Sequence, residues 1–282
     1  MRILALDTAT EACSCALLLD GSVLRRDTEL RKGHAEIILS MVDELLREAG
    51  TTLPMLDAIA FGRGPGSFTG VRLAASVAQG LAFGAGLGVI AVSDLRAVAQ
   101  GVLGNAAAAR VLVCNDARMQ EVYWSCFERG ADGLMHGVAG EHVGPPDRVE
   151  LPPQWGGAHA GAADARAAAD ARAAADARAA ADAGATADAR AAADALAAAG
   201  AAADALGTAQ PLFGAGRGFA AYPDLRSRWL PRLAGLDDAR LPSAADMLPL
   251  AKAELQAGRL LPPEAALPVY LRDEVAVAKS GA

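Results

Sequence analysis

The chain has 282 residues, 53% of them hydrophobic, and its 26 basic and 33 acidic residues give a formal net charge of −7. This length suffices for one large domain or two ordinary ones. The acidic balance argues against a protein that grips nucleic acid by itself, because neutralising phosphates requires a basic face. No stretch is long and apolar enough for a membrane span, and the four cysteines form no Cys-x-x-Cys pair. We therefore expect a cytoplasmic protein with reduced cysteines and no membrane partner.

The first third of the chain is predicted to alternate strands with helices. Apolar runs bounded by turn residues indicate strands, and Asp20-Gly21 is a strong signal for a tight hairpin. The expected strands cover residues 3–8, 13–19, 23–26, 57–61 and 89–92, and the expected helices cover residues 34–48, 71–83 and 93–100.

A glycine-rich turn, Gly-Arg-Gly-Pro-Gly-Ser-Phe-Thr-Gly-Val-Arg over residues 62–72, joins a predicted strand to a predicted helix. Glycine allows close backbone approach, and Ser67 or Thr69 can cap the helix. Such a loop either packs the helix tightly on its strand or aims amide groups at an anion. It lacks the Gly-Lys-Ser/Thr ending of a P-loop and the spacing of a dinucleotide fingerprint.

Residues 64–72 closely resemble the signature of the bacterial TsaB (YeaZ) family, which belongs to the actin-like/sugar kinase/Hsp70 superfamily. The segments 116–118, 121–123 and 268–272 extend the resemblance to the rest of the chain. It implies an α/β, two-lobed actin-like (ribonuclease H-like) fold with mixed sheets. We expect an N-terminal lobe over residues 1–106 and a C-terminal lobe over residues 107–282.

An alanine-rich insert interrupts the second predicted lobe over residues 160–207. It repeats Ala-Asp-Ala-Arg-Ala-Ala with a period of six, and alanine is the strongest helix former. Six residues do not return to the same side of an α-helix, so the charges wind around it and leave no apolar stripe. We expect a helical or disordered, solvent-exposed arm without chemistry.

In active members of the superfamily, two turns cradle the phosphates of a nucleotide, with a carboxylate near the metal. Asp7 occupies the carboxylate position, but the turn after it has no glycine and carries Glu11. In the second turn, Ala117 and Arg118 replace glycines, and we expect Arg118 to pair with Glu121 more readily than with an anion. The candidate nucleotide-binding residues are Asp7, Gly64, Gly66, Ser67, Thr69, Gly214 and Gly216.

No metal site is predicted. The resemblance implies that the paralogue TsaD holds its metal with paired histidines on the helix that corresponds to residues 34–48. Here Ile38 follows His34 at the position of the second ligand, and the four histidines form no His-x-x-x-His pair. His34 is therefore expected to cap its helix or to lie at an interface.

Helix 34–48 has more apolar positions than the stripe of an ordinary surface helix, and helix 71–83 carries several small residues. Either the first helix lies between two layers of its own domain, or it offers a face to another protein. The resemblance favours the second option, because TsaB proteins pair with TsaD through helices of this lobe. The expected contact residues are His34, Ile37, Ile38, Met41, Leu45, Val71, Ala74, Ala75 and Ala78.

The resemblance implies a non-catalytic scaffold of the tRNA threonylcarbamoyladenosine machinery, which binds and activates TsaD together with the ATPase TsaE. Such a subunit would contact tRNA only through the complex, would need no cofactor of its own beyond ATP or ADP at the partner interface, and could form a homodimer without its partner. The alternative is an active ATP-dependent phosphotransferase or ATPase of the same fold, which would use Asp7, Asp116 and the glycine turn at residues 214–218.

Overall fold

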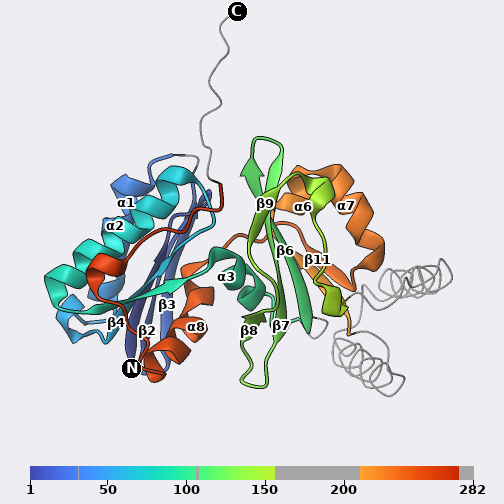
Figure 1. Cartoon of the computed structure of the whole chain (residues 1–282). Coiled ribbons are helices and arrows are strands. Elements are labelled where there is room, and N and C mark those ends of the chain that lie inside the picture. The colour runs from blue at the N-terminus through green and yellow to red at the C-terminus, as the bar shows by residue number, and fades with distance from the viewer. Residues whose placement is uncertain (31, 106–107, 156–209, 273–282) are drawn as a thin grey trace, which may run out of the picture.

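The computed structural model describes residues 1–30, 32–105, 108–155 and 210–272, so the insert predicted over residues 160–207 lies outside them. The described residues form two lobes, each built on one mixed sheet with helices on both faces (Figure 1). The two-lobed α/β architecture predicted from the sequence is confirmed.

The sheet of the first lobe has the order β3-β2-β1-β4-β5. Strands β1, β2 and β3 are antiparallel, whereas β4 and β5 run parallel to β1. Every residue of β4, an interior strand, is buried, as expected of a parallel strand covered on both faces. The bounds are β1 Arg2–Asp7, β2 Ala12–Leu19, β3 Ser22–Glu29, β4 Ala58–Gly62 and β5 Gly88–Val92.

Helices α1 (His34–Glu48) and α2 (Phe68–Ala85) cover one face of this sheet. The Ser67 side chain caps α2 by accepting a hydrogen bond from the amide of Gly70, as the sequence predicts. Gly86 ends the helix in the left-handed conformation that glycine adopts readily. The hairpin predicted at Asp20-Gly21 is also confirmed.

The second lobe repeats the same strand order, with β8-β7-β6 antiparallel and β10 and β11 parallel to β6. Strand β9 pairs with β7. Helices α6 and α7 pack on one face of this sheet. The bounds are β6 Arg110–Arg118, β7 Glu121–Arg129, β8 Met135–Gly137, β9 His142–Gly144, β10 Leu212–Ala215, β11 Gly235–Asp237, α6 Gly218–Ala221 and α7 Pro223–Trp229. Short 3-10 turns are η1 Leu53–Met55, η2 Pro146–Arg148, η3 Pro153–Trp155, η4 Leu230–Arg232 and η5 Pro263–Ala265.

Two helices cross between the lobes and correct the predicted domain boundary. Helix α3 (Asp94–Gly101) follows β5 of the first sheet but packs on the second sheet. Helix α8 (Ala244–Gln256) follows β11 of the second sheet but packs on the first sheet. The predicted division at residues 106 and 107 assigned everything after residue 106 to the second lobe. The structure instead packs α8 on the first lobe.

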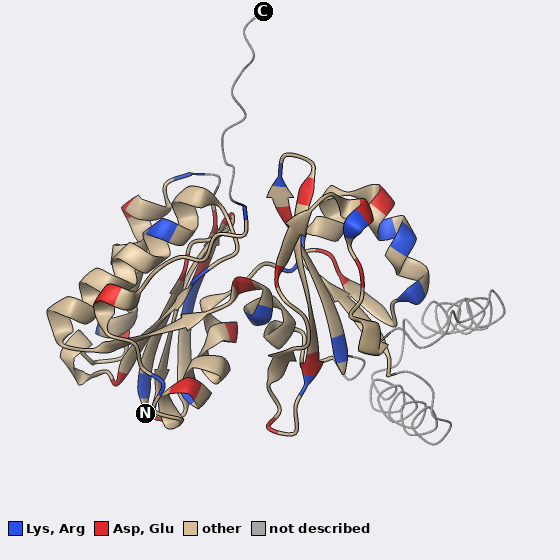
Figure 2. Cartoon of the chain, viewed as in Figure 1, with Lys and Arg blue, Asp and Glu red and all other residues tan. Residues whose placement is uncertain are grey.

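Acidic and basic residues are interspersed along the ribbon of both lobes in the view of Figure 2. No helix in the described residues combines the length and the apolar character that crossing a bilayer requires.

Candidate functional site

A cleft with a volume of about 500 Å³ lies between the two lobes. The first lobe contributes the turn between β1 and β2, the start of α1 and the glycine-rich loop before α2. The second lobe contributes the end of β6 and Tyr123 of β7. The main lining segments are residues 8–11, 32–36, 65–70 and 115–118. The cleft thus lies between the two turns that the sequence analysis matched to the phosphate cradles of active superfamily members.

Hydrogen bonds join the glycine-rich loop to the turn after β1. The amide of Ser67 donates to the carbonyl of Ala9 at 2.7 Å, and Oγ1 of Thr8 donates to the carbonyl of Gly70 at 2.7 Å. A Cβ on Gly70 would lie only 2.1 Å from the carbonyl oxygen of Thr8. Glycine is therefore required here for close backbone packing, which supports the tight-turn interpretation of the motif.

Asp7, at the end of β1, faces Asp94 at the start of α3. Both side chains are fully buried and lie close together, since a Cβ on Gly62 would lie 2.5 Å from Oδ1 of Asp7 and 2.6 Å from Oδ1 of Asp94. Burial raises the pKa of Asp7 to about 6, and burial together with the Asp7 charge raises the pKa of Asp94 well above its usual value. Two carboxyls in this arrangement share a proton, so Asp7 is a buried structural partner and not a group exposed in the cleft.

An ion pair crosses the cleft between Glu11 of the first lobe and Arg118 of the second. Arg118 also lies 2.9 Å from Asp116, whereas Glu121 pairs with Arg272. The predicted pair between Arg118 and Glu121 is therefore wrong, because the positive φ of Arg118 belongs to a turn that sends its side chain toward the first lobe. The ion pair links the two turns that would hold phosphates in an active relative.

The candidate nucleotide-binding residues separate into two groups. Gly66, Ser67 and Thr69 line the cleft. Asp7, Gly64, Gly214 and Gly216 are buried, and a Cβ on Gly214 would collide with Leu233 and Leu236. The structure does not bring the seven residues together around one ligand-sized space.

The cleft also contains two buried polar groups, Asn115, which the sequence analysis did not select, and His34, which it expected at a helix cap or an interface. Asn115 is 4% exposed, and neither its oxygen nor its nitrogen has a protein partner within the described residues. Nε2 of His34 is likewise buried and unpartnered. Gly33, in a left-handed conformation, occupies the N-cap of α1, so His34 is the first helical residue and lines the cleft.

Within the described ranges, no group of three or more His, Cys, Asp or Glu side chains is arranged to hold a metal ion. All four cysteines are free and buried. Burial raises the pKa of Cys13 to about 11 and that of Cys126 to about 12, which disfavours the reactive thiolate.

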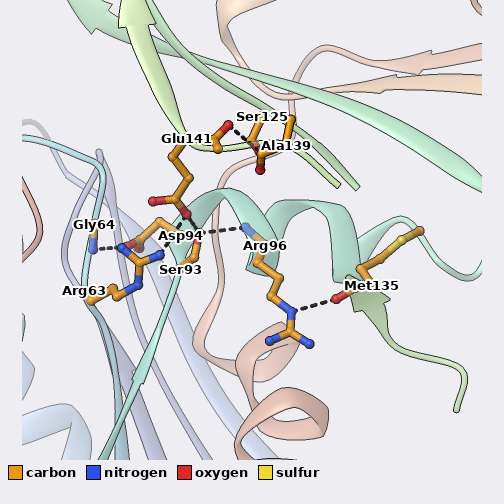
Figure 3. Close-up of polar contacts among 10 residues, drawn as sticks. Arg63, Gly64, Ser93, Asp94, Arg96, Ser125, Met135, Ala139 and Glu141 are labelled. Atoms are coloured by element: carbon orange, nitrogen blue, oxygen red, sulfur yellow. Dashed lines mark hydrogen bonds and ion pairs between the residues drawn. The ribbon is translucent and has the colours of Figure 1, made fainter. Parts of the chain in front are cut away.

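The lobes are joined on the other side of the glycine-rich loop by polar contacts that Figure 3 draws. Glu141 of the second lobe binds Arg63 at 3.0 Å and also accepts a hydrogen bond from the Ser93 hydroxyl. Nε of Arg96 donates to the carbonyl of Met135 at 2.6 Å. These contacts place α3 between the two lobes, and no sequence motif indicated them.

Most of the predicted partner-contact residues point into the lobe. Ile37 and Met41 are half-buried, as is His34. The prediction is corrected for the remaining six, because their side chains are at most 3% exposed and form the core between the helices and the sheet: Ile38, Leu45, Val71, Ala74, Ala75 and Ala78.

The outer surfaces of α1 and α2 carry other residues. Leu39 of α1 is 53% exposed, and Phe83 of α2 is 78% exposed. On α2, Ser76, Gly80 and Gly84 are exposed at intervals of four, and a Cβ on either glycine would meet no atom within 4 Å. Residues four apart share one side of a helix, so α2 presents a smooth, weakly polar surface. We call this exposed face of α1 and α2 the helical surface.

Comparison with known proteins places the chain. The family model described as "TsaD: tRNA N6-adenosine threonylcarbamoyltransferase" matches residues 28–221. TsaB from Escherichia coli K12 is 36% identical over 285 residues, which cover 98% of this chain and 96% of the relative. TsaB from Haemophilus influenzae is 52% identical over 125 residues, 44% of this chain and 53% of that relative.

Solved structures agree. YeaZ from Pseudomonas aeruginosa is 37% identical and has a TM-score of 0.69. The match covers 96% of this chain and 99% of the YeaZ chain. A second Pseudomonas aeruginosa structure, described as similar to peptidase YeaZ, has the same TM-score at 38% identity. The predicted actin-like fold is thereby confirmed. The chain belongs to the TsaB (YeaZ) family of tRNA threonylcarbamoyladenosine biosynthesis proteins.

Proposed function

We propose that the chain is a non-catalytic scaffold subunit of tRNA threonylcarbamoyladenosine biosynthesis, and that it binds and activates the catalytic paralogue TsaD together with TsaE. The observation that carries this proposal is the helical surface on α1 and α2. A glycine inside a helix costs about 1 kcal/mol relative to alanine. Gly80 and Gly84 have open space around them, so nothing within the described chain requires them.

A partner helix would make use of these glycines. Small residues at intervals of four let a second helix approach closely, Phe83 supplies exposed apolar area next to Gly84, and Leu39 adds exposed apolar area on α1. The TsaD family model matches 28–221 of this chain, so a paralogous partner carries helices of the same kind. If α1 and α2 pack against the corresponding two helices of the paralogue, the exposed apolar area of both subunits is buried.

The non-catalytic role is supported by the cleft. Glu11 and Arg118 bridge it, and Asp7 is sequestered by Asp94. The cleft also exposes Glu36 and Asp116, whose charges oppose polyphosphate. We therefore propose that the chain binds no nucleotide by itself, and that ATP or ADP is held only at the interface with TsaD.

We further propose that tRNA reaches this chain only through the complex, because charges of both signs are interspersed in the described residues (Figure 2). The proposed setting is the cytoplasm. Without TsaD, the helical surface is expected to pair two copies of the chain, which analytical ultracentrifugation of the free and mixed proteins can measure.

Co-purification with TsaD tests the docking. Phe83→Asp and Leu39→Asp place a charge on the helical surface and should abolish co-purification while the isolated variants stay folded. Leu230→Asp is the matched control, since Leu230 is an exposed leucine of the second lobe. Retained binding by both helical-surface variants would place the interface elsewhere. Ile38 is unsuitable for this test because a charge at a fully buried position unfolds the lobe.

ATP hydrolysis by the isolated chain separates the scaffold from a phosphotransferase of the same fold. The scaffold predicts a rate at the buffer background, with modified tRNA appearing only when TsaD and TsaE are added. Turnover by the purified chain that disappears in a Thr69→Ala variant, whose side chain lines the cleft, would favour the phosphotransferase.

A further inference from the structure

Two sequence motifs that lie far apart in the chain meet at the first turn of α2. Residues 62–72 form the glycine-rich loop and the start of α2, and residues 268–272 end the described chain. We call residues 260–272 the C-terminal strap. The strap pairs with β5 at Leu261, η5 packs on α2, and Ala266 enters the core of the first lobe (Figure 1).

The strap then fits closely against the glycine-rich loop. The amide of Val269 donates to the carbonyl of Arg63 at 2.7 Å. Gly64 has a φ of +100°, and a Cβ there would lie 2.9 Å from the carbonyl oxygen of Val269. The strap ends on the second lobe, where Arg272 pairs with Glu121 and donates to the carbonyl of Ala117 at 3.3 Å.

This arrangement fixes Arg72, which is exposed and is the single charged residue of α2. Its guanidinium carbon lies 3.3 Å from the ring centroid of Phe68 and 5.2 Å from that of Tyr270. Nε of Arg72 donates to the Tyr270 hydroxyl at 2.6 Å. Within the described residues, no carboxylate lies within ion-pair distance of this guanidinium.

Arg72 is therefore an ordered cation that is positioned to bind an anionic group. Its side chain is already ordered by two rings and one hydrogen bond, so a further ligand would not have to immobilise it. Both rings remain about half exposed, Phe68 at 46% and Tyr270 at 44%. Arginine and tyrosine in this setting are typical of the residues that dominate protein interfaces.

We propose that Arg72 is the charged anchor of the helical surface and receives a carboxylate side chain of the paralogous subunit, and that the strap exists in part to hold it ready. The proposal rests on the proposed function, since it uses the same α2 surface. A planar guanidinium binds a carboxylate through two parallel hydrogen bonds. A protein carboxylate fits better than an RNA phosphate because it brings a single negative charge close to Glu11, Glu36 and Asp116 of the adjoining cleft, whereas an RNA backbone carries a charge at every phosphate.

Affinity for the purified paralogue, measured by isothermal titration with wild-type chain and variants, tests the anchor. Arg72→Ala should weaken binding about 10-fold or more without lowering the melting temperature of the isolated chain by more than a few degrees. Arg72→Lys should not rescue binding, because an ammonium cannot stack flat between two rings. Tyr270→Phe keeps the ring but removes the acceptor of Nε, and should weaken binding less than Arg72→Ala.

Arg232→Ala is the matched control, since the Arg232 guanidinium lies over Trp229 in the second lobe at 5.4 Å from the ring centroid. Wild-type affinity in Arg72→Ala, together with loss of binding in Phe83→Asp, would overturn the anchor and leave the proposed docking intact. Failure of the wild-type chain to bind would overturn both. Unchanged protein affinity with weakened tRNA binding by the assembled Arg72→Ala complex would replace the carboxylate by an RNA phosphate and also overturn the proposal.

Discussion

Asp7 and Asp94 face each other in the interior of the first lobe, and each also holds a loop that borders the cleft. Asp7 accepts a hydrogen bond from the amide of Ala9 at 2.9 Å, and Asp94 accepts one from the amide of Gly64. The carboxyl pair thus ties the turn after β1 to the glycine-rich loop. Because one shared proton keeps the pair from carrying two charges, its protonation state matters for the stability of both loops.

The carboxyl pair predicts a pH dependence of stability. Both groups titrate above the range of the unfolded chain, so their stabilisation is complete below about pH 4. It is lost as the pH rises through the folded pKa of Asp7, about 6, and continues to fall toward the higher folded pKa of Asp94. Asp94→Asn keeps a neutral group that accepts from Gly64 and donates to Asp7.

Urea unfolding of wild type and Asp94→Asn across this range measures the effect. Between about pH 5 and pH 8, we expect wild type to lose on the order of 2 kcal/mol more unfolding free energy than the variant. All other titrating groups are common to the two chains, so parallel curves would mean that the carboxyls do not share a proton.

A second prediction compares two glycines of α2. Gly70→Ala should destabilise the chain by about 3 kcal/mol or more, because its Cβ would lie 2.1 Å from the carbonyl oxygen of Thr8 and the backbone must move. Gly80→Ala should instead stabilise the isolated chain by about 0.5–1 kcal/mol, since its Cβ meets open space and alanine favours the helix. Denaturant unfolding of both variants checks the difference, and similar effects would contradict the packing described for Gly70.

The same Gly80→Ala variant carries a third prediction. If a partner helix lies against the helical surface, the added methyl group should weaken binding to TsaD even as it stabilises the free chain. Opposite signs of these two effects are difficult to obtain from a purely structural glycine. Titration of TsaD with the variant measures the loss of affinity. Gly104→Ala is the matched control, because its Cβ also meets open space. Gly258→Ala is unsuitable as a control, because Gly258 has a φ of +70° and alanine would be strained there. Unchanged affinity would place the partner helix elsewhere.

Local structure was predictable where one residue type has one physical use. Asp20-Gly21 forms its hairpin and Ser67 caps α2, because these effects depend on neighbours in sequence. The orientation of α1 was not predictable in the same way. Its apolar positions surround much of the helix, so the sequence could not tell that Ile38 and Leu45 face the sheet while Leu39 faces outward.

Pairings between segments that lie far apart in the sequence could not be predicted either. Ser93-Asp94 has the composition of a helix start, so the sequence predicted a helix there. It gave no sign that Asp94 is buried against Asp7. Glu121 is close to Arg118 in sequence, yet it forms its ion pair with Arg272, because the strap ends on the second lobe. A signal for the strap was present in residues 268–272, but their partners depend on the tertiary fold and on the crossing of α8.

A fourth prediction concerns the strap. Arg272→Glu removes the ion pair with Glu121 that joins the strap to the second lobe, and should destabilise the chain by about 1–2 kcal/mol because the pair is largely buried. Adding Glu121→Arg should recover part of this loss, which a double-mutant cycle in urea measures. Exchange of Arg259 and Glu254, an exposed pair within the first lobe, is the control and should change stability little. Equal loss in the single and double variants would mean that the pair does not hold the strap.

The last prediction concerns the ion pair across the cleft. Glu11 stands in the turn where an active relative would bind phosphate, and its charge both repels a polyanion and engages Arg118. Glu11→Gln should therefore raise the affinity of the isolated chain for inorganic tripolyphosphate by about fivefold, equivalent to roughly 1 kcal/mol for one carboxylate in a solvated site. Glu48→Gln, which removes an exposed carboxylate paired with Arg26 on the first lobe, should leave that affinity unchanged. Because Glu11 is partly exposed, its loss should have little effect on folding, so the titration reports on the cleft itself. Tight binding by the wild-type chain, equal to that of Glu11→Gln, would mean that the ion pair yields to phosphate and does not exclude it.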